Sequence, residues 1–336
     1  MRKVLVVGTG GLGSIVAFAL SYTAKSYVAV VVRSDYEKVK NVGWEINSCD
    51  YGHIKGWKPD AIYPSIEEAA KNDKYDYVVV TTKNIPEVTK VEEIIEPVVT
   101  KGFTAIVLIQ NGFDLGKPFL QKYPDNYCLS GVSYIGSSNH SGVINHTKDD
   151  DIIISYFNNK TFTKEQQREK CKEFVDLYKN DCNKARFEDD VKVCRYGKLL
   201  WNATYNTICA LTRLDTGRLE LSGTFEALAV PAMRELIKVA RADGVEFPPD
   251  IINTTSHICG DLYYKPSMLL DVERGNPMEL EIILGNVLKV SQELKVETPI
   301  LNVLYHLLKG IQFKILEDCG LVEVPKVRPD LNKFYS

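Results

Sequence analysis

Six residues near the N-terminus, Gly8-Thr9-Gly10-Gly11-Leu12-Gly13, have the G-x-G-x-x-G spacing of a dinucleotide-binding turn. Each glycine of that spacing has a physical task. Gly8 permits a tight turn, Gly10 has no side chain to keep a pyrophosphate from the backbone, and Gly13 lets a helix pack closely on a sheet. A helix that begins at this turn offers N–H groups and the positive end of its dipole to the phosphates.

The residues on both sides of the motif supply the elements that such a turn needs. Residues 4–7 are apolar and predict a strand, residues 14–21 predict a helix rich in small residues, and residues 28–33 predict a second strand. This βαβ context favours a nucleotide site over the alternative, a glycine-rich loop in an unrelated α/β protein.

Arg33 lies at the end of the second predicted strand and indicates which cofactor is used. An NAD-binding unit usually has Asp or Glu there to hold the ribose 2′-hydroxyl, whereas a guanidinium suits the 2′-phosphate of NADP(H). Lys38 and Lys40 follow nearby. NADP(H) is therefore predicted, although a solvated arginine is an alternative and Asp35, two residues on, could bind a ribose hydroxyl instead.

Two further predicted strands end in polar residues. Residues 76–83 form an apolar strand that ends at Lys83, and residues 105–109 form another that is followed by Gln110-Asn111-Gly112. Ligands of open α/β sheets lie beyond the carboxyl ends of the strands. We therefore expect Lys83 and Asn111 to contact the cofactor; for Lys83 considered alone, a solvated terminal charge is the simpler explanation.

Lys198, Asn202 and Asn206 recur at every fourth position of a predicted helix from Val191 to Leu211, which places them on one face. Apolar and aromatic residues lie between them, so the helix is expected to be largely buried. A buried cation and two buried amides need partners. They are predicted to line a ligand site, with a structural polar network between helices as the alternative.

The order of the predicted elements indicates two domains in the 336 residues: an α/β Rossmann-type domain at residues 1–188 and a helical domain at 189–336, with the boundary near Asp189. In the first domain we expect residues 41–75 to be largely irregular, Pro86 to begin a helix that runs to about Val99, and three runs to add strands to the sheet, at 129–135, 142–146 and 151–156. In the second we expect a loose arm after Val324 and helices at 191–211, 221–243, 249–261, 279–294 and 299–316.

Charge and hydropathy exclude several classes of protein. A net charge of −3 provides no basic field for nucleic acid or an anionic membrane, and the longest apolar runs have the length of strands, so neither partner is expected. The N-terminus enters a core strand at once, which argues against a signal peptide. The eight cysteines are scattered and form no C-x-x-C, so we expect reduced thiols, no metal site and a cytoplasmic protein.

Several motifs together identify a family resemblance that spans nearly the whole chain. They are the glycine turn, Thr82-Lys83, Gln110-Asn111-Gly112, Ala210-Leu211-Thr212, the run Gly197-Lys198-Leu199-Leu200-Trp201-Asn202-Ala203-Thr204-Tyr205-Asn206, and Pro266-Ser267-Met268-Leu269-Leu270-Asp271-Val272 with Glu279 twelve residues after Ser267. With these motifs the chain resembles the ketopantoate reductases (2-dehydropantoate 2-reductases). The resemblance implies a Rossmann domain followed by an all-helical domain like that of 6-phosphogluconate dehydrogenase. It also implies NADPH-dependent reduction of ketopantoate to pantoate, an oxidoreductase step of pantothenate biosynthesis.

By position, the resemblance assigns roles to individual residues. It implies that Lys198 is the catalytic general acid and that Glu279 assists it, by orienting Lys198 or by accepting a hydrogen bond from the substrate's hydroxyl. It also implies that Asn202, Asn206 and Ser267 bind the substrate, and that Arg33, Lys83 and Asn111 bind the cofactor. Hydride would go to the C2 carbonyl of a 2-oxo acid while Lys198 stabilises the charge that grows on the oxygen and gives up a proton.

Two departures from the family pattern leave the substrate open. Thr207 stands where members often have Pro, and Thr216 stands where an Asn commonly precedes the next glycine. A reductase of another 2-oxo acid, such as a D-2-hydroxy acid dehydrogenase, is therefore an alternative. A non-catalytic NADP(H) sensor is a second one, which retention of both Lys198 and Glu279 disfavours. Exposed helices of the second domain could support a homodimer.

Overall fold

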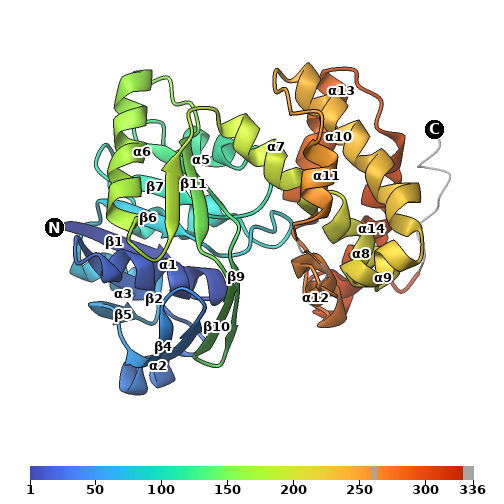
Figure 1. The fold of residues 1–336 in the computed structure, drawn as a ribbon. Coiled ribbons are helices and arrows are strands. Elements are labelled where there is room, and N and C mark those ends of the chain that lie inside the picture. The colour runs from blue at the N-terminus through green and yellow to red at the C-terminus, as the bar shows by residue number, and fades with distance from the viewer. Residues whose placement is uncertain (259, 261–262, 328–336) are drawn as a thin grey trace. The chain divides into compact units, whose positions relative to one another are not determined.

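The structure is a computed structural model that describes residues 1–258, 260 and 263–327 (Figure 1). The chain divides into two compact units, Met1–Lys198 and Leu199–Ser336. The first is built on parallel strands and the second is helical, so the predicted fold class is confirmed. The division falls inside helix α7 (Val191–Asn202), whereas the change in composition predicts a boundary near Asp189.

Eight of the described strands form the main sheet of the first unit, in the order β12-β11-β8-β7-β6-β1-β2-β5. All neighbours are parallel except β8 and β11. The strand order reverses at β1: β2 and β5 follow on one side of it, and the chain then returns to add β6, β7 and β8 on the other side. Such a reversal leaves a crevice at the carboxyl ends of β1 and β6. The bounds are β1 Arg2–Val7, β2 Ser26–Val31, β5 Ala61–Tyr63, β6 Tyr77–Val80, β7 Ala105–Leu108, β8 Cys128–Ser133, β11 Asp151–Tyr156 and β12 Lys184–Phe187.

A second sheet in this unit was not expected from the sequence. It has the order β4-β3-β10-β9, with β3 Trp44–Ser48, β4 Gly52–Trp57, β9 Gly136–His140 and β10 Val143–Lys148. The prediction that residues 41–75 are largely irregular was therefore wrong, and the run at 142–146 does not complete the main sheet. The cause is non-local: β3 pairs with β10, about a hundred residues further along the chain, and no local pattern encodes that partner.

Helices of the first unit cover the main sheet. Residues of α1 and α6 share one core with the central strands, and the Tyr77 ring of β6 lies 5.3 Å from the Phe174 ring of α6. The helix predicted from Pro86 to Val99 is wrong in its first half, because residues 85–89 form turns in which Val88 and Thr89 donate to Ile85 O. The bounds are α1 Gly11–Tyr22, α2 Tyr36–Val42, α3 Ile66–Asn72, α4 Val91–Ile94, the 3₁₀ helix η1 Glu96–Val98, α5 Gly116–Lys122 and α6 Lys164–Tyr178.

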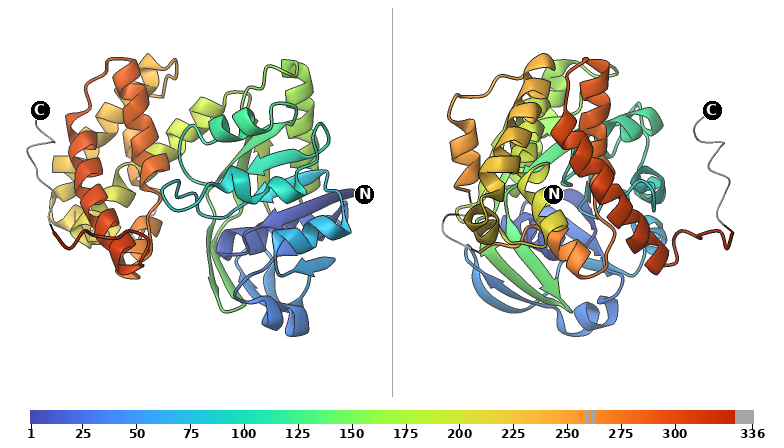
Figure 2. Two further views of the ribbon diagram at one scale, coloured as in Figure 1. Left: turned by 180° about the vertical axis from the view of Figure 1, so that it is seen from behind. Right: turned by 90° about the vertical axis from the view of Figure 1, so that its right-hand side faces the viewer.

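The second unit consists of helices within its described residues. Its longest helix, α14, lies beside α8 and α10 within the unit (Figure 2). Two segments, η2 and η3, are π-helical, which is rare and often marks functional positions. Of the predicted helix 249–261, residues 259 and 261–262 are outside the described residues, as is the arm beyond residue 327. The bounds are α8 Tyr205–Thr212, α9 Thr216–Leu221, η2 Phe225–Ala229, α10 Val230–Ala242, α11 Ile251–Ser256, α12 Ser267–Glu273, η3 Glu281–Gly285, α13 Asn286–Glu293 and α14 Pro299–Asp318.

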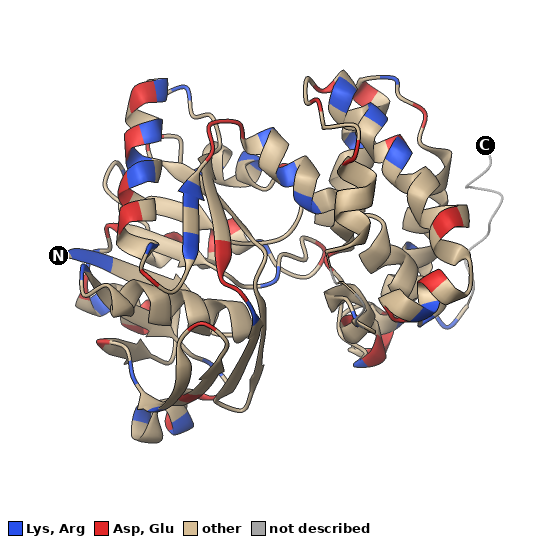
Figure 3. Ribbon diagram, in the orientation of Figure 1, with Lys and Arg blue, Asp and Glu red and all other residues tan. Residues whose placement is uncertain are grey.

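Charged residues of both signs alternate along the ribbon, as on α6 (Figure 3). There Arg168, Lys170 and Lys172 each pair with a glutamate three residues away. Among the described residues, no helix combines the length and the apolar character needed to cross a bilayer.

Candidate functional site

The glycine-rich turn connects β1 to α1 as predicted, and the structure shows why glycine is needed at its first and last positions. Gly8 has a φ of +101°, and a Cβ on it would lie 2.7 Å from Thr82 N. A Cβ on Gly13 would overlap Gly8 O. Gly10 differs, because no atom of the described residues lies within 4 Å of the position its Cβ would take. The backbone at Gly10 is therefore open to a ligand, while Gly8 and Gly13 close the turn against the sheet.

The second sheet supports this turn from one side, which sequence reasoning did not reveal. The Asn139 side chain on β9 donates through Nδ2 to Thr9 O (2.9 Å) and to Asp35 Oδ2 (3.3 Å), and its Oδ1 accepts from Gly142 N (2.9 Å). A Cβ on Gly11 would overlap the backbone of Ser137, also on β9. The glycine at position 11, which the spacing does not demand, is the sequence signal of this close approach.

The predicted cofactor residues follow the ends of strands on both sides of β1 in the main sheet. Arg33 is exposed two residues after β2, Lys83 is exposed after β6, and Asn111 is half-buried after β7. Gln110 Nε2 donates to Thr82 O (2.7 Å) and so ties the segments after β6 and β7 together. Asp35, the competitor of Arg33 for the ribose, accepts the hydrogen bond from Asn139 instead of lying free.

Lys198 is held at the end of β8 by two contacts within the first unit. Its Nζ donates to Ser133 O (3.0 Å) and lies 4.6 Å from the ring centroid of Tyr134, within the range of a cation–π interaction. Burial raises the pKa of Tyr134 to about 12, so this ring is a neutral phenol at physiological pH. The ammonium is half-buried and fixed in direction, as a group that must meet a reacting atom should be.

Arg195 lies one turn before Lys198 on α7, and no role was assigned to it from the sequence. The side chain is buried, and burial lowers the pKa of its guanidinium to about 10. It donates to Ser130 Oγ (2.9 Å) and to four backbone carbonyls, those of Gln110 (2.5 Å), Gly112 (3.3 Å), Leu108 (3.2 Å) and Gly131 (3.4 Å). These bonds fix α7 to the end of β7, on both sides of Asn111, and to the middle of β8. The sequence signal that could have indicated this role is an arginine placed among apolar residues of a predicted helix.

The continuous helix predicted from Val191 to Leu211 is wrong, because it breaks at Ala203-Thr204 between α7 and α8. Thr204 has φ −121° and ψ −80°. The hydroxyl of Thr207 donates to Ala203 O (2.9 Å) and Thr204 O (2.8 Å), and such side-chain bonds compete with the helical ladder. Lys198 and Asn202 therefore belong to α7 and Asn206 to α8, and the three do not form one uninterrupted stripe.

Within the second unit, the structure brings two of the predicted substrate residues together. Asn206 donates from Nδ2 to Ser267 Oγ (3.2 Å), and its Oδ1 accepts from Met268 N (2.7 Å) in the first turn of α12. Asn202 and Glu279 are also buried, with Glu279 two residues before the π-helix η3.

Thr216, one of the two departures from the family pattern, fixes the segment that leads to Ser267. Its N–H donates to Tyr264 O (3.0 Å), and its hydroxyl accepts from Tyr264 N (3.1 Å). A Cβ on the next residue, Gly217, would lie 2.7 Å from the Tyr263 ring. A threonine here makes two backbone bonds and leaves no amide to face a ligand.

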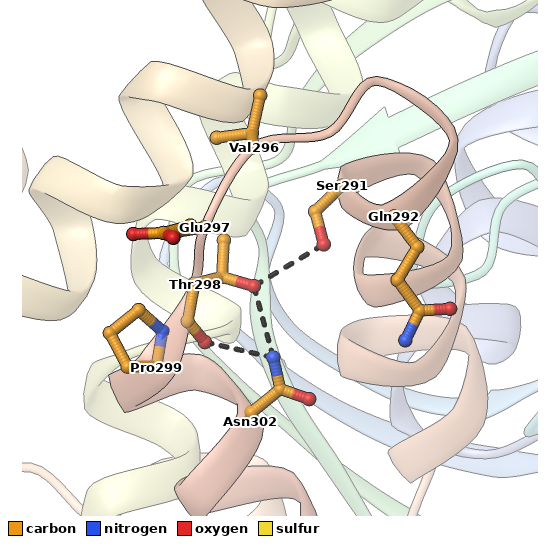
Figure 4. A pocket seen from close by; sticks show the side chains of 7 residues that line it. All are labelled: Ser291, Gln292, Val296, Glu297, Thr298, Pro299 and Asn302. Carbon is orange, nitrogen blue, oxygen red and sulfur yellow. Dashed lines mark hydrogen bonds between the residues drawn. The ribbon is translucent and has the colours of Figure 1, made fainter.

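A hollow of about 440 Å³ lies elsewhere in the second unit, between α13 and α14 (Figure 4). Its polar side chains bond with one another: Asn302 Nδ2 donates to Thr298 O (3.0 Å), and Thr298 Oγ1 lies 3.2 Å from Ser291 Oγ. None of the predicted site residues lines it.

Comparisons with known proteins agree with the residues that carry the resemblance. Residues 4–159 match the family model described as "Ketopantoate reductase PanE/ApbA", and residues 190–312 match that of its C-terminal part. An uncharacterized protein of Saccharomyces cerevisiae is 38% identical, with 96% of this chain and 97% of that protein covered. A 2-dehydropantoate 2-reductase of Nostoc is 27% identical over 92% of this chain and 94% of its own. The crystal structure of the 2-dehydropantoate 2-reductase from Methylococcus capsulatus has a TM-score of 0.81 at 30% identity, covering 93% of this chain and 97% of that one.

Proposed function

Because the chain belongs to the ketopantoate reductase family, we propose that it is an NADPH-dependent reductase of a 2-oxo acid, with 2-dehydropantoate as the first substrate to test. The observation that carries the proposal is the fixed position of Lys198, whose Nζ is bound by Ser133 O and by the face of Tyr134. A lysine used only as a surface charge has no need of such a setting.

The glycine turn fits a dinucleotide. Gly10 faces open space, and α1 begins without an acidic residue in its first turn and without a side-chain cap, so its first N–H groups can bind phosphate oxygens. Gly8 to Gly13, Lys83 and Asn111 would hold the cofactor, and Arg33 would bind its 2′-phosphate. When bound, the nicotinamide supplies a hydride to the carbonyl carbon.

The residues of the chain supply the rest of the proposed reaction. The Lys198 ammonium stabilises the negative charge that develops on the ketone oxygen and donates a proton to it. Asn206 and Ser267, which are already bonded to each other, bind the substrate carboxylate together with Asn202. Glu279 accepts a hydrogen bond from the substrate's hydroxyl.

A panel of 2-oxo acids with NADPH and with NADH tests the function. Oxidation of NADPH with 2-dehydropantoate supports the full proposal, and oxidation only with other 2-oxo acids keeps the reaction but changes the substrate, as Thr207 and Thr216 allow. NADPH binding without turnover across the panel would favour a sensor. Lys198→Ala should lower kcat by about 10²- to 10⁴-fold. Lys192→Ala is the matched control on the same helix, where the side chain is exposed; if Lys198→Ala stays within tenfold of wild type, Lys198 is not the acid.

We also propose that the chain forms a homodimer through α14. Val303, Leu307 and Phe313 on this helix are 59%, 56% and 49% exposed, and the first two share one face at a spacing of four. Light scattering should give twice the chain mass, and Leu307→Glu should reduce it to one chain mass; a monomeric wild type at micromolar concentration contradicts the proposal.

A further inference from the structure

Three potential metal ligands meet where β3 ends beside β10, the two inner strands of the second sheet. Cys49 and Asp50 follow β3, and His146 lies on the adjoining strand β10. Their ligand atoms all lie within 4.8 Å of one another. The pairing of β3 with β10 sets Ser48 beside His146, and Cys49 N donates to His146 O (3.0 Å), so the backbone itself fixes the group.

His146 is the observation that points to a ligand. Its side chain is wholly buried, with Nδ1 2.7 Å from Ser48 Oγ. Its Nε2 is buried too and has no hydrogen-bond partner among the described residues; the carboxylate oxygen Asp50 Oδ2 is 3.8 Å away, beyond hydrogen-bond range. A buried polar atom without a partner is unfavourable and so calls for an explanation.

Asp50 and Cys49 complete a set of ligands of suitable spacing. Asp50 Oδ2 accepts from Asp150 N (2.8 Å), which orients the carboxylate, and Asp50 Oδ1 lies 3.7 Å from Cys49 Sγ. Two ligand atoms on a tetrahedral zinc, at bond lengths of about 2.0–2.3 Å, are about 3.3–3.7 Å apart. The separations of 3.7 and 3.8 Å involve the two different oxygens of Asp50, and the three ligand atoms lie within 4.8 Å of one another, so a bound zinc would draw the side chains together by up to about 1 Å. Cys49 is exposed, so an ion can reach the buried nitrogen from the surface.

We propose that Cys49, Asp50 and His146 bind a zinc ion that cross-links β3 to β10, with water as the fourth ligand. The mixed sulfur, nitrogen and oxygen donors suit zinc, whereas calcium and magnesium take oxygen ligands. The Cys49 thiol releases its proton to solvent as the Sγ–Zn bond forms, and no redox change occurs. His146 binds through Nε2, and its Nδ1, 2.7 Å from Ser48 Oγ, is oriented by that hydroxyl. The sequence argument expected no metal site, because the histidine is far from the cysteine in the chain.

The test is a zinc titration of chelator-treated full-length protein against a chromogenic chelator. Wild type should bind one zinc per chain, and Cys49→Ser and Asp50→Asn should each weaken binding at least tenfold. Asp50→Asn retains an oxygen for the bond from Asp150 N, and Cys49 is exposed, so both variants should fold. Cys319→Ser removes another exposed thiol, one in the second unit, and should bind zinc as wild type does.

Two readouts, one spectroscopic and one thermal, distinguish this site from adventitious binding of the metal by other thiols. Cobalt(II) in place of zinc should give a thiolate-to-metal charge-transfer band in wild type and in Cys319→Ser, and none in Cys49→Ser. Zinc should raise the melting temperature of the same two proteins and not that of Cys49→Ser, because a ligand stabilises only the state that binds it. The absence of binding in wild type, or equal binding by Cys49→Ser, overturns the proposal. The result is independent of reductase activity.

Discussion

Replacing Arg195 with lysine tests whether the guanidinium fork holds α7 to the sheet. The substitution keeps the positive charge, so the cost of burying a charge is nearly the same in both proteins. The difference lies in the number and direction of donors: Arg195 serves five acceptors, and an ammonium has three N–H groups.

At least two acceptors therefore lose their partner in Arg195→Lys. Each buried acceptor without a donor costs about 1–3 kcal/mol, so the free energy of unfolding of the first unit should fall by about 2–6 kcal/mol. For a domain of this size, about 2–4 °C is lost per kcal/mol, so the melting temperature should fall by at least about 4 °C. Because Lys198 lies one turn further along α7, kcat should fall by a larger factor than KM rises.

The assay is differential scanning calorimetry, with Arg168→Lys as the matched control. Arg168 also makes a forked ion pair, with Asp189, but it lies at the surface of the same unit, where such pairs are worth less than about 1 kcal/mol. If Arg195→Lys melts within about 2 °C of wild type, or no lower than Arg168→Lys, the fork does not fix the helix as argued.

Three further substitutions separate the roles of the other residues. Arg33→Ala should raise the KM for NADPH about ten- to a hundredfold, for about 1.5–3 kcal/mol of lost pairing, and leave that for NADH unchanged; equal use of both cofactors by wild type would contradict the assignment. Asn139→Ala loosens the glycine turn and should raise the KM for both cofactors by one common factor of about five, for about 1 kcal/mol, so a change for NADPH alone would refute this role. Asn206→Ala removes the acceptor of Met268 N and the partner of Ser267; it should lower the stability of the second unit by about 1 kcal/mol and raise the KM for the oxo acid, and an unchanged KM would argue against substrate contact.

Some features of the protein follow from the sequence alone because their causes are local. The turn at Gly8–Gly13 was predictable, since its glycines lie in one stretch of chain: Gly8 has a positive φ, and a Cβ on Gly13 would overlap Gly8 O within the turn. The central strands were predictable for a similar reason: a strand buried on both faces is a short run of apolar residues, as at 77–80 and 105–108. The motif around Lys198 indicated the family for the same reason, that it lies in one stretch of chain.

Only the tertiary structure decided what depends on partners distant in the chain. The strand at 44–48 pairs with β10 on one side and with β4 on the other, and its pairing with β10 also brings His146 to Cys49 and Asp50. The sequence shows Arg195 as one arginine in a helix, but its five acceptors come from residues 108–112 and 130–131. A hydrogen-bonding group or a strand pairs with whichever group or strand the fold places beside it, and local sequence does not specify that partner. Residue types and spacing could therefore predict the nucleotide turn and the lysine, but not the contacts that hold them in place.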